Sequence, residues 1–206
     1  LGDCYIGNVD TAIDTNRPLF RAYTNDSNGN LKEVIHSAHT MLGVIQRLSS
    51  DDVSEQFRST ELVTQMCPAV SYVAASVLMP MASDKLLILD PFCAPEDVDL
   101  EMMRYRPNCW PLIPMFIETI MRNGRVPDDY DMSHLFVAGA GCEAYNNNQL
   151  KRAQKFLNDH NCKARFTTGY GCSEAGSNMT LPMTPHPIGN GNVGIPMPLS
   201  VMSVFR

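Results

Sequence analysis

The sequence predicts an α/β fold with a mostly parallel β-sheet covered by helices. First, short apolar segments alternate with segments of helical periodicity along most of the 206 residues, which is the pattern of parallel βαβ units. Second, residues 85–90 are apolar almost without interruption, as in a strand of a sheet that is covered on both faces. Third, the length suits one core, since folding buries about 70% of the extended chain's surface at this size.

The N-terminal half begins with two strand-like segments, 19–24 and 33–36, on either side of a turn cluster of Asn, Asp, Ser and Gly at 25–30. Residues 40–48 carry apolar side chains at helical spacing. The half is completed by a strand over 60–65, an apolar helix over 69–82 and the strand at 85–90.

The C-terminal half continues the alternation. Residues 95–103 begin with proline and acidic residues, which is typical of a helix N-terminus. Residues 147–159 form an amphipathic pattern, with apolar residues on one face and basic residues on the other. The other predicted elements are strands at 108–113, 134–138 and 163–167, a helix at 115–122, and short strands in the Gly- and Pro-rich remainder.

Composition and charge exclude several classes of protein. The 44% apolar and 18% charged residues argue against intrinsic disorder. With 22 acidic and 16 basic residues the net charge is −6, and without a basic stripe nucleic acid is not expected as a partner. The apolar stretch 62–82 is interrupted by polar residues and two prolines, which favours a buried helix over a membrane span.

The cysteines and the chain ends carry two further expectations. Seven cysteines without a Cys-x-x-Cys pair argue against a disulfide framework or a zinc site and favour reduced thiols in a cytoplasmic protein. The chain begins at Leu1 without a signal sequence and stops in an apolar run at 200–206. We therefore expect a fragment of a longer protein.

Ligands of parallel sheets bind beyond the carboxyl ends of the strands, so three loops are candidates for a site. Residues 24–32 combine hydroxyls, a glycine and a lysine that can bind phosphate, although the same cluster is typical of a simple turn. Residues 139–144 match the dinucleotide pattern G-x-G-x-x-A. However, the ribose-binding acid expected near Thr167 is missing, and close packing of helix on strand explains the glycines equally well.

The third loop, residues 169–176, carries polar groups suited to a nucleotide. Tyr170 could stack on a base, Ser173 could bond a phosphate oxygen, and Glu174 could hold Mg²⁺. The structural alternative is a helix start with Ser173 as its N-cap.

Residues 170–174, Tyr-Gly-Cys-Ser-Glu, resemble the Tyr-Gly-x-Thr/Ser-Glu motif of the adenylate-forming enzymes, which include acyl-CoA synthetases, luciferases and peptide-synthetase adenylation domains. Residues 24–34 resemble the family's Thr/Ser/Gly-rich phosphate loop with its lysine. Further similar segments stand in the family's order at 88–96, 114, 138–142 and 191–198, so that the resemblance covers about 19–204. The chain is thereby identified as a fragment, 1–206, of the AMP-binding N-terminal domain, without the C-terminal lid domain.

The resemblance implies ATP-dependent activation of a small carboxylic acid to an acyl-adenylate, followed by transfer to a thiol such as coenzyme A. It implies catalytic roles for Ser173, Glu174 and Lys32, with Mg²⁺ on Glu174. It implies nucleotide binding by Thr24, Ser27, Gly29, Gly139, Ala140, Gly141, Tyr170, Gly171 and Cys172. It implies a substrate pocket lined by Trp110, Ile113, Cys142 and Thr168, with plain core packing as the alternative for Trp110.

The sequence departs from the family pattern in the phosphate loop. Asn25 and Asp26 replace Ser-Gly, and Glu33 replaces the glycine after the lysine, which places two carboxylates where like charge would repel a triphosphate. A degenerate adenylate-binding or regulatory module without catalysis is therefore an alternative, as is a dinucleotide-dependent oxidoreductase. Since the family's later ribose-binding Asp and catalytic lysine are not among these residues, we expect the fragment alone to be inactive.

Overall fold

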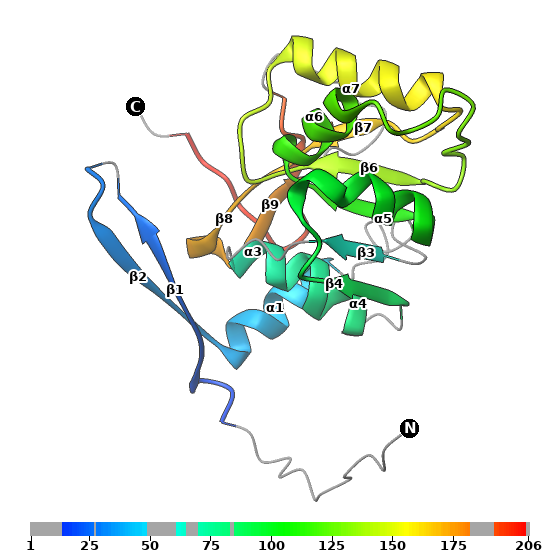
Figure 1. Ribbon diagram of the computed structural model, residues 1–206. Coiled ribbons are helices and arrows are strands. Elements are labelled where there is room, and N and C mark those ends of the chain that lie inside the picture. The colour runs from blue at the N-terminus through cyan, green and yellow to red at the C-terminus, as the bar shows by residue number, and fades with distance from the viewer. Residues whose placement is uncertain are drawn as a thin grey trace, which may run out of the picture.

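Five of the segments predicted as strands, 60–65, 85–90, 108–113, 134–138 and 163–167, contribute the strands of a parallel sheet at the centre of the molecule (Figure 1). The computed structural model describes residues 14–26, 28–48, 61–64, 70–82, 85–181 and 192–204. The sheet order is β4-β3-β5-β6-β7, which confirms the predicted α/β class. The strands are β3 (Glu61–Thr64), β4 (Leu87–Asp90), β5 (Cys109–Leu112), β6 (Val137–Ala140) and β7 (Phe166–Thr168).

Helices connect successive strands of this sheet in two directions. The helix over residues 70–82 leads from β3 to β4, whereas α5 (Val98–Tyr105), α6 (Pro114–Asn123) and α7 (Asn147–Asp159) lead the other way across the sheet. Because such crossovers are right-handed, the reversal puts helix 70–82 on the opposite face from α5, α6 and α7. Figure 1 shows α6 and α7 side by side above the strands.

Two separate cores agree with this arrangement. The larger core joins the central sheet to α5, α6 and α7; its largest fully buried side chains are Leu62, Met102, Phe116, Ile117, Ile120, Met132, Leu135 and Phe166. The smaller core joins α1 (Ala38–Leu48) to helix 70–82 through Met41, Val44, Val70, Ala74, Met79 and Met197. The smaller core lies beneath the candidate site described below.

Helix 70–82 changes its winding at its centre. It begins as α3 (Val70–Val73), widens to a π-helical turn (Ala74–Leu78) and ends as α4 (Met79–Ala82). The Met79 N–H donates to the Ala74 carbonyl across the wider turn. Pro80 accounts for the change, because its ring would clash with the carbonyl four residues earlier in a regular α-helix.

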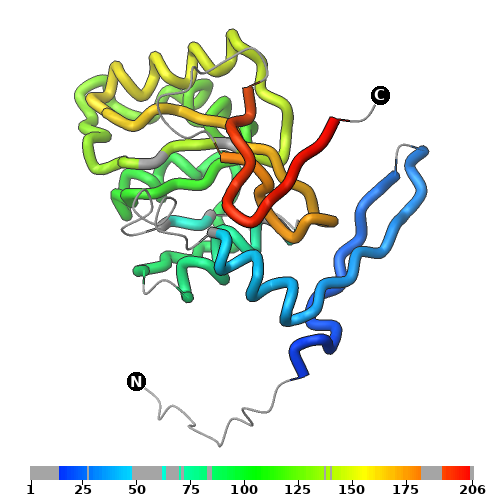
Figure 2. Tube along the Cα trace, turned by 180° about the vertical axis from the view of Figure 1, so that it is seen from behind, coloured from blue at the N-terminus to red at the C-terminus, as the bar shows by residue number. Residues whose placement is uncertain are grey.

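The two N-terminal strands form a hairpin apart from the central sheet. Strands β1 (Pro18–Asn25) and β2 (Leu31–Ser37) pair antiparallel and lead into α1. The hairpin stands off the rest of the molecule in both views (Figures 1 and 2). The short turn between β1 and β2 requires their antiparallel pairing, because parallel neighbours need a much longer crossover.

The C-terminal part forms a small third sheet of antiparallel strands in the order β10-β9-β8. Its strands are β8 (Tyr170–Cys172), β9 (Ser177–Leu181) and β10 (Ile195–Pro196). Strand β8 follows directly on β7 after Gly169, so the small sheet continues from the edge of the central one. Among the described residues, none of the helices combines the length and apolar character that crossing a bilayer requires.

Candidate functional site

The turn of the N-terminal hairpin is built around Asp26. Its carboxylate accepts hydrogen bonds from the backbone N–H groups of Asn28 and Asn30, both at 2.8 Å, and from the Asn30 side chain at 3.1 Å. These hydrogen bonds lower the pKa of Asp26, and the bond from the Asn30 side chain contributes most. Gly29 closes the turn at φ 82°. Asp26 therefore has a structural role in this turn. Ser27, which was predicted to bind the nucleotide, lies outside the described residues.

The hairpin presents different side chains on its two faces. Thr24 and Lys32 stand opposite each other in the register and share the face that carries the buried Val34. Glu33 lies on the other face, where its carboxylate pairs with Arg21 at 3.2 Å. Glu33 therefore does not share a face with Lys32, because side chains alternate along a strand. This arrangement does not support the expected repulsion of a phosphate beside Lys32.

Glu174 joins the hairpin to the C-terminal sheet. It lies in a 3₁₀ turn, Ser173–Ala175, between β8 and β9. One carboxylate oxygen, Oε1, accepts from Thr24 Oγ1 at 3.0 Å and from Lys32 Nζ at 3.2 Å. The pKa of Glu174 is lowered by hydrogen bonds, most by the one from its own backbone N–H and then by those from Lys32 and Thr24. The structure thus brings Glu174 to two hairpin residues that lie far from it in the sequence, with its ionised carboxylate between them.

His36 holds this turn against the hairpin. It is 3% exposed, and its Nε2–H donates to the Ser173 carbonyl at 2.6 Å. Gly176 ends the turn at φ 77°, and a side chain there would meet Val44 at 3.0 Å and Met41 at 3.2 Å. The sequence analysis missed His36. Its position four residues after Lys32, on the same face of β2, is the signal that could have found it.

The turn is not the start of a longer helix. The 3₁₀ turn has Cys172 at its N-cap position, without a side-chain capping bond, and ends after three residues. The alternative interpretation of Ser173 as a helix N-cap is therefore wrong.

The loops after β6 and β7 lie side by side. Ala140 pairs with Thr168 in the register, so Gly141 and Tyr170 follow adjacent strand ends. A side chain at Gly139 would stand 3.1 Å from Thr167 Oγ1, whereas one at Gly141 would meet nothing within 4 Å. The glycine at 139 is thus explained by close strand packing, and the backbone at 141 borders open space.

Three of the predicted nucleotide-binding positions, Tyr170, Gly171 and Cys172, form β8. Tyr170 is 48% exposed, so its ring is accessible. A side chain at Gly171 would stand 2.7 Å from the Ser177 carbonyl oxygen, so close pairing with β9 requires glycine there. Cys172 is half-buried next to the turn.

The dinucleotide hypothesis finds no support at residues 139–144. Helix α7 begins six residues after Gly141, and its first N–H groups are capped by the Asn146 side chain in a capping box with Gln149. A dinucleotide site instead needs a helix N-terminus directly after the glycines.

The four residues predicted to line a substrate pocket occupy different environments. Trp110 is 3% exposed within the larger core, in line with its alternative as plain core. Ile113 is half-buried at the N-cap of α6. Cys142 is exposed, at φ 69°, and Thr168 donates its hydroxyl to the Asn192 carbonyl at 3.3 Å.

Comparison with known proteins matches residues 7–205 to the model of one family, AMP-binding enzyme. Similar solved structures include a long-chain-fatty-acid-CoA ligase from Archaeoglobus fulgidus, with TM-score 0.73 and 15% identity over 86% of this chain and 36% of the other. A benzoate CoA ligase from Burkholderia xenovorans LB400 gives a TM-score of 0.71 and 14% identity over 91% of this chain and 36% of the other. A fatty acid AMP ligase from Legionella pneumophila gives a TM-score of 0.67 and 17% identity over 82% of this chain and 31% of the other.

At these identities the solved structures establish the fold, and the chain spans about a third of the length of each of the three. No curated protein matches the chain. The family model covers all but a few residues at the ends, and therefore the chain belongs to the family of AMP-binding enzymes.

Proposed function

We propose that the chain is part of an ATP-dependent enzyme that activates a carboxylic acid as an acyl-adenylate and transfers the acyl group to a thiol such as coenzyme A. Family membership supports the adenylate chemistry. The observation that carries the proposal is the meeting of Thr24 and Lys32 with Glu174 at 3.0 and 3.2 Å. A hydroxyl, an ammonium and a carboxylate at one point can bind both the phosphates and the cation of a nucleotide.

In the first step, an oxygen of the acid attacks the α-phosphorus of ATP, and the bond from that phosphorus to pyrophosphate breaks. In the second step, the thiolate attacks the acyl carbonyl and AMP leaves. The protein's part is to position the reactants and balance their charge. Lys32 and Thr24 would donate to the β- and γ-phosphates, and Ser173 would contact the α-phosphate.

The donor set fits a magnesium ion held jointly with the nucleotide. The lowered pKa of Glu174 keeps its carboxylate ionised at neutral pH, and carboxylate and phosphate oxygens are ligands that Mg²⁺ prefers. The described residues contain no group of three or more His, Cys, Asp and Glu side chains that could hold a metal without the nucleotide. When bound with ATP on Glu174, Mg²⁺ would neutralise phosphate charge.

The open space at Gly141 and the accessible Tyr170 ring support an adenine position beside these two residues, since aromatic faces stack on bases. The acid would lie near Ile113, Cys142 and Thr168. An aromatic or fatty acid is the substrate class that we infer, because two of the similar solved structures are ligases of benzoate and of long-chain fatty acids.

Residues 1–206 would form part of the nucleotide-binding domain of a cytoplasmic enzyme whose lid domain lies elsewhere in the full-length protein. The chain alone would bind ATP without completing turnover. The alternative, a binding module that has lost catalysis, was motivated by Asp26 and Glu33. Both carboxylates have structural partners, Asn30 and Arg21 respectively.

Displacement of a fluorescent ATP analogue from the chain tests the nucleotide site. Lys32→Met is expected to weaken binding about tenfold, because it removes a charge-assisted bond to phosphate. Lys151→Met, on the exposed face of α7, is the matched control and should change nothing. Equal binding by both variants would refute the site. Pyrophosphate release by the full-length protein with a panel of acids separates the enzyme from the inactive module, and release by this chain alone would contradict its expected inactivity.

A further inference from the structure

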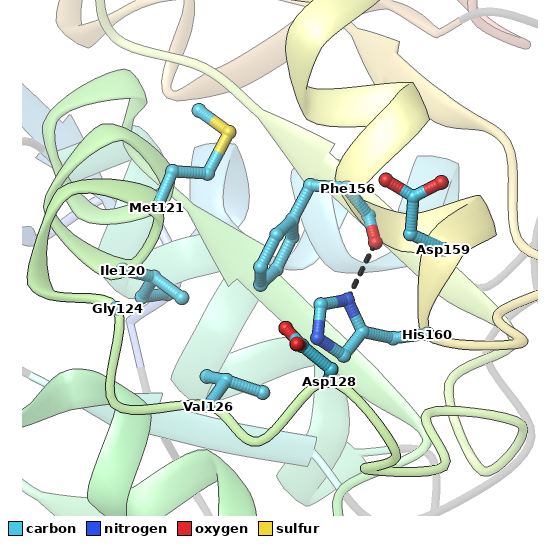
Figure 3. A pocket seen from close by; sticks show the side chains of 8 residues that line it. All are labelled: Ile120, Met121, Gly124, Val126, Asp128, Phe156, Asp159 and His160. Atoms are coloured by element: carbon cyan, nitrogen blue, oxygen red, sulfur yellow. Dashed lines mark hydrogen bonds between the residues drawn. The ribbon is translucent and has the colours of Figure 1, made fainter.

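A second concave site lies between helices α6 and α7. The cavity has a volume of about 510 Å³ and is bordered by the last turns of both helices and by the loop that follows α6 (Figure 3). None of the residues assigned above to the nucleotide or the acid lines it. It therefore needs an explanation of its own.

An unpartnered imidazole nitrogen is the most informative feature of the cavity. His160 is 7% exposed, and its Nδ1–H donates to the Phe156 carbonyl at 2.7 Å. In the neutral ring, Nε2 then carries a lone pair, and among the described residues it has no hydrogen-bond partner. In Figure 3 this nitrogen faces the space beside Asp128. A buried acceptor without a donor is unfavourable, so a ligand with an N–H group would supply the missing hydrogen bond to Nε2.

The charges around the cavity favour a cation. The carboxylates of Asp128 and Asp159 both lie at its border. Helices α6 and α7 also end here, and the carbonyls at a helix C-terminus carry partial negative charge. Lys155 balances the negative charge of Asp159, because its Nζ lies 2.5 Å from that carboxylate. Asp128 takes part in none of the described ion pairs.

The rest of the wall is apolar. Ile120, Met121 and Val126 line one side, and the Phe156 ring lies against His160 with 4.4 Å between ring centroids. Such a wall accommodates a hydrocarbon chain and would not favour a fully hydrated inorganic ion.

We propose that this cavity binds a small aliphatic primary ammonium ion. Its NH₃⁺ group donates to His160 Nε2 and to the Asp128 carboxylate, while its alkyl chain packs on Phe156 and the α6 side chains. An ammonium group supplies three donors and a positive charge, which matches the acceptors and the charge of the site. A metal ion fits less well, since the described residues hold no cluster of three ligating side chains.

Calorimetric titration of the chain with n-pentylammonium chloride tests the proposal, with 1-pentanol and sodium pentanoate as probes of equal length. Saturable binding is expected for the ammonium ion alone. His160→Phe, which keeps a ring beside Phe156, should weaken binding about tenfold, and Asp128→Asn about threefold. Asp129→Asn, an exposed neighbour that does not line the cavity, is the matched control.

Three results of these titrations with the pentyl probes would overturn the proposal: no saturable binding of the ammonium ion, equal binding of pentanol, or Asp128→Asn behaving like Asp129→Asn. The two aspartate variants keep the test decisive if His160→Phe fails to fold, because both carboxylates are exposed. Lysine-containing peptides added in a separate titration distinguish a protein partner's side chain from a free amine. Tighter saturable binding of the peptides would overturn the proposal of a small amine, and weaker binding would support it.

Discussion

Replacing Glu174 by glutamine tests the candidate nucleotide site most directly, because the effect is expected to change sign with magnesium. Without nucleotide, Glu174 Oε1 holds both Thr24 and Lys32. ATP without magnesium must break these contacts and approach an ionised carboxylate. The glutamine variant removes that charge, whereas in the presence of Mg²⁺ it lacks the carboxylate that would bind the metal.

The magnitude follows from the exposure of the pair. The side chains of Lys32 and Glu174 are 54% and 40% exposed, so solvent screens their attraction and the ion pair contributes about 0.5–1 kcal/mol. Releasing Lys32 should therefore tighten binding of magnesium-free ATP about two- to fivefold. With Mg²⁺, loss of the carboxylate should weaken binding about tenfold or more.

Competition of ATP against a fluorescent analogue, in EDTA and in excess Mg²⁺, measures both effects. Glu33→Gln is the matched control: it removes the same charge from the same hairpin, but on the face that carries Arg21. It should leave both affinities nearly unchanged. Weaker binding of Glu174→Gln in EDTA as well as in Mg²⁺ would refute the proposed competition, as would a Glu33→Gln variant with the same reversal of sign.

Three further predictions concern the framework of the site. His36→Leu should lower the free energy of unfolding in urea by about 1–3 kcal/mol, because it leaves the Ser173 carbonyl without its donor; a loss under 0.5 kcal/mol would contradict this. Gly171→Ala should destabilise by a similar ~1–3 kcal/mol, since its new side chain stands 2.7 Å from a β9 carbonyl, while Gly141→Ala, which meets no atom, should melt like the parent. The bonds that lower the pKa of Asp26 stabilise the folded chain above the ordinary aspartate pKa, and this stability is lost as pH falls through the lowered value. Asp26→Asn should thus flatten the acid limb of a stability-versus-pH curve, and an unchanged limb would refute it.

Helix positions were predictable where their signals are local. Helix α7 runs from Asn147 to Asp159 as predicted, because Asn146 and Gln149 form a capping box at its start and the apolar face has helical spacing. The strand predicted from 134 instead begins at Val137. His134 had the right apolar neighbours for a strand, but its ring bonds the Pro107 carbonyl at 2.6 Å, a contact between distant segments.

The candidate site shows the same division. Thr24, Lys32 and Glu174 could be named from their motifs, yet the sequence placed Glu33 beside Lys32 without showing that it faces the other way. The task of Asp26 in the turn and of His36 under Ser173 depends on hydrogen bonds that only the folded chain defines.

The amino-acid sequence by itself determined the alternation of strands and helices, the turn at 25–30 and the motif at 170–174, because periodicity, capping and turn chemistry act over a few neighbouring residues. Only the tertiary structure decided that Glu174 meets Lys32 and Thr24, which stand 142 and 150 positions earlier in the chain. Such contacts depend on how the hairpin, α1 and the C-terminal sheet pack on one another. That packing is set by the shape of the two cores, which no local segment of the sequence contains.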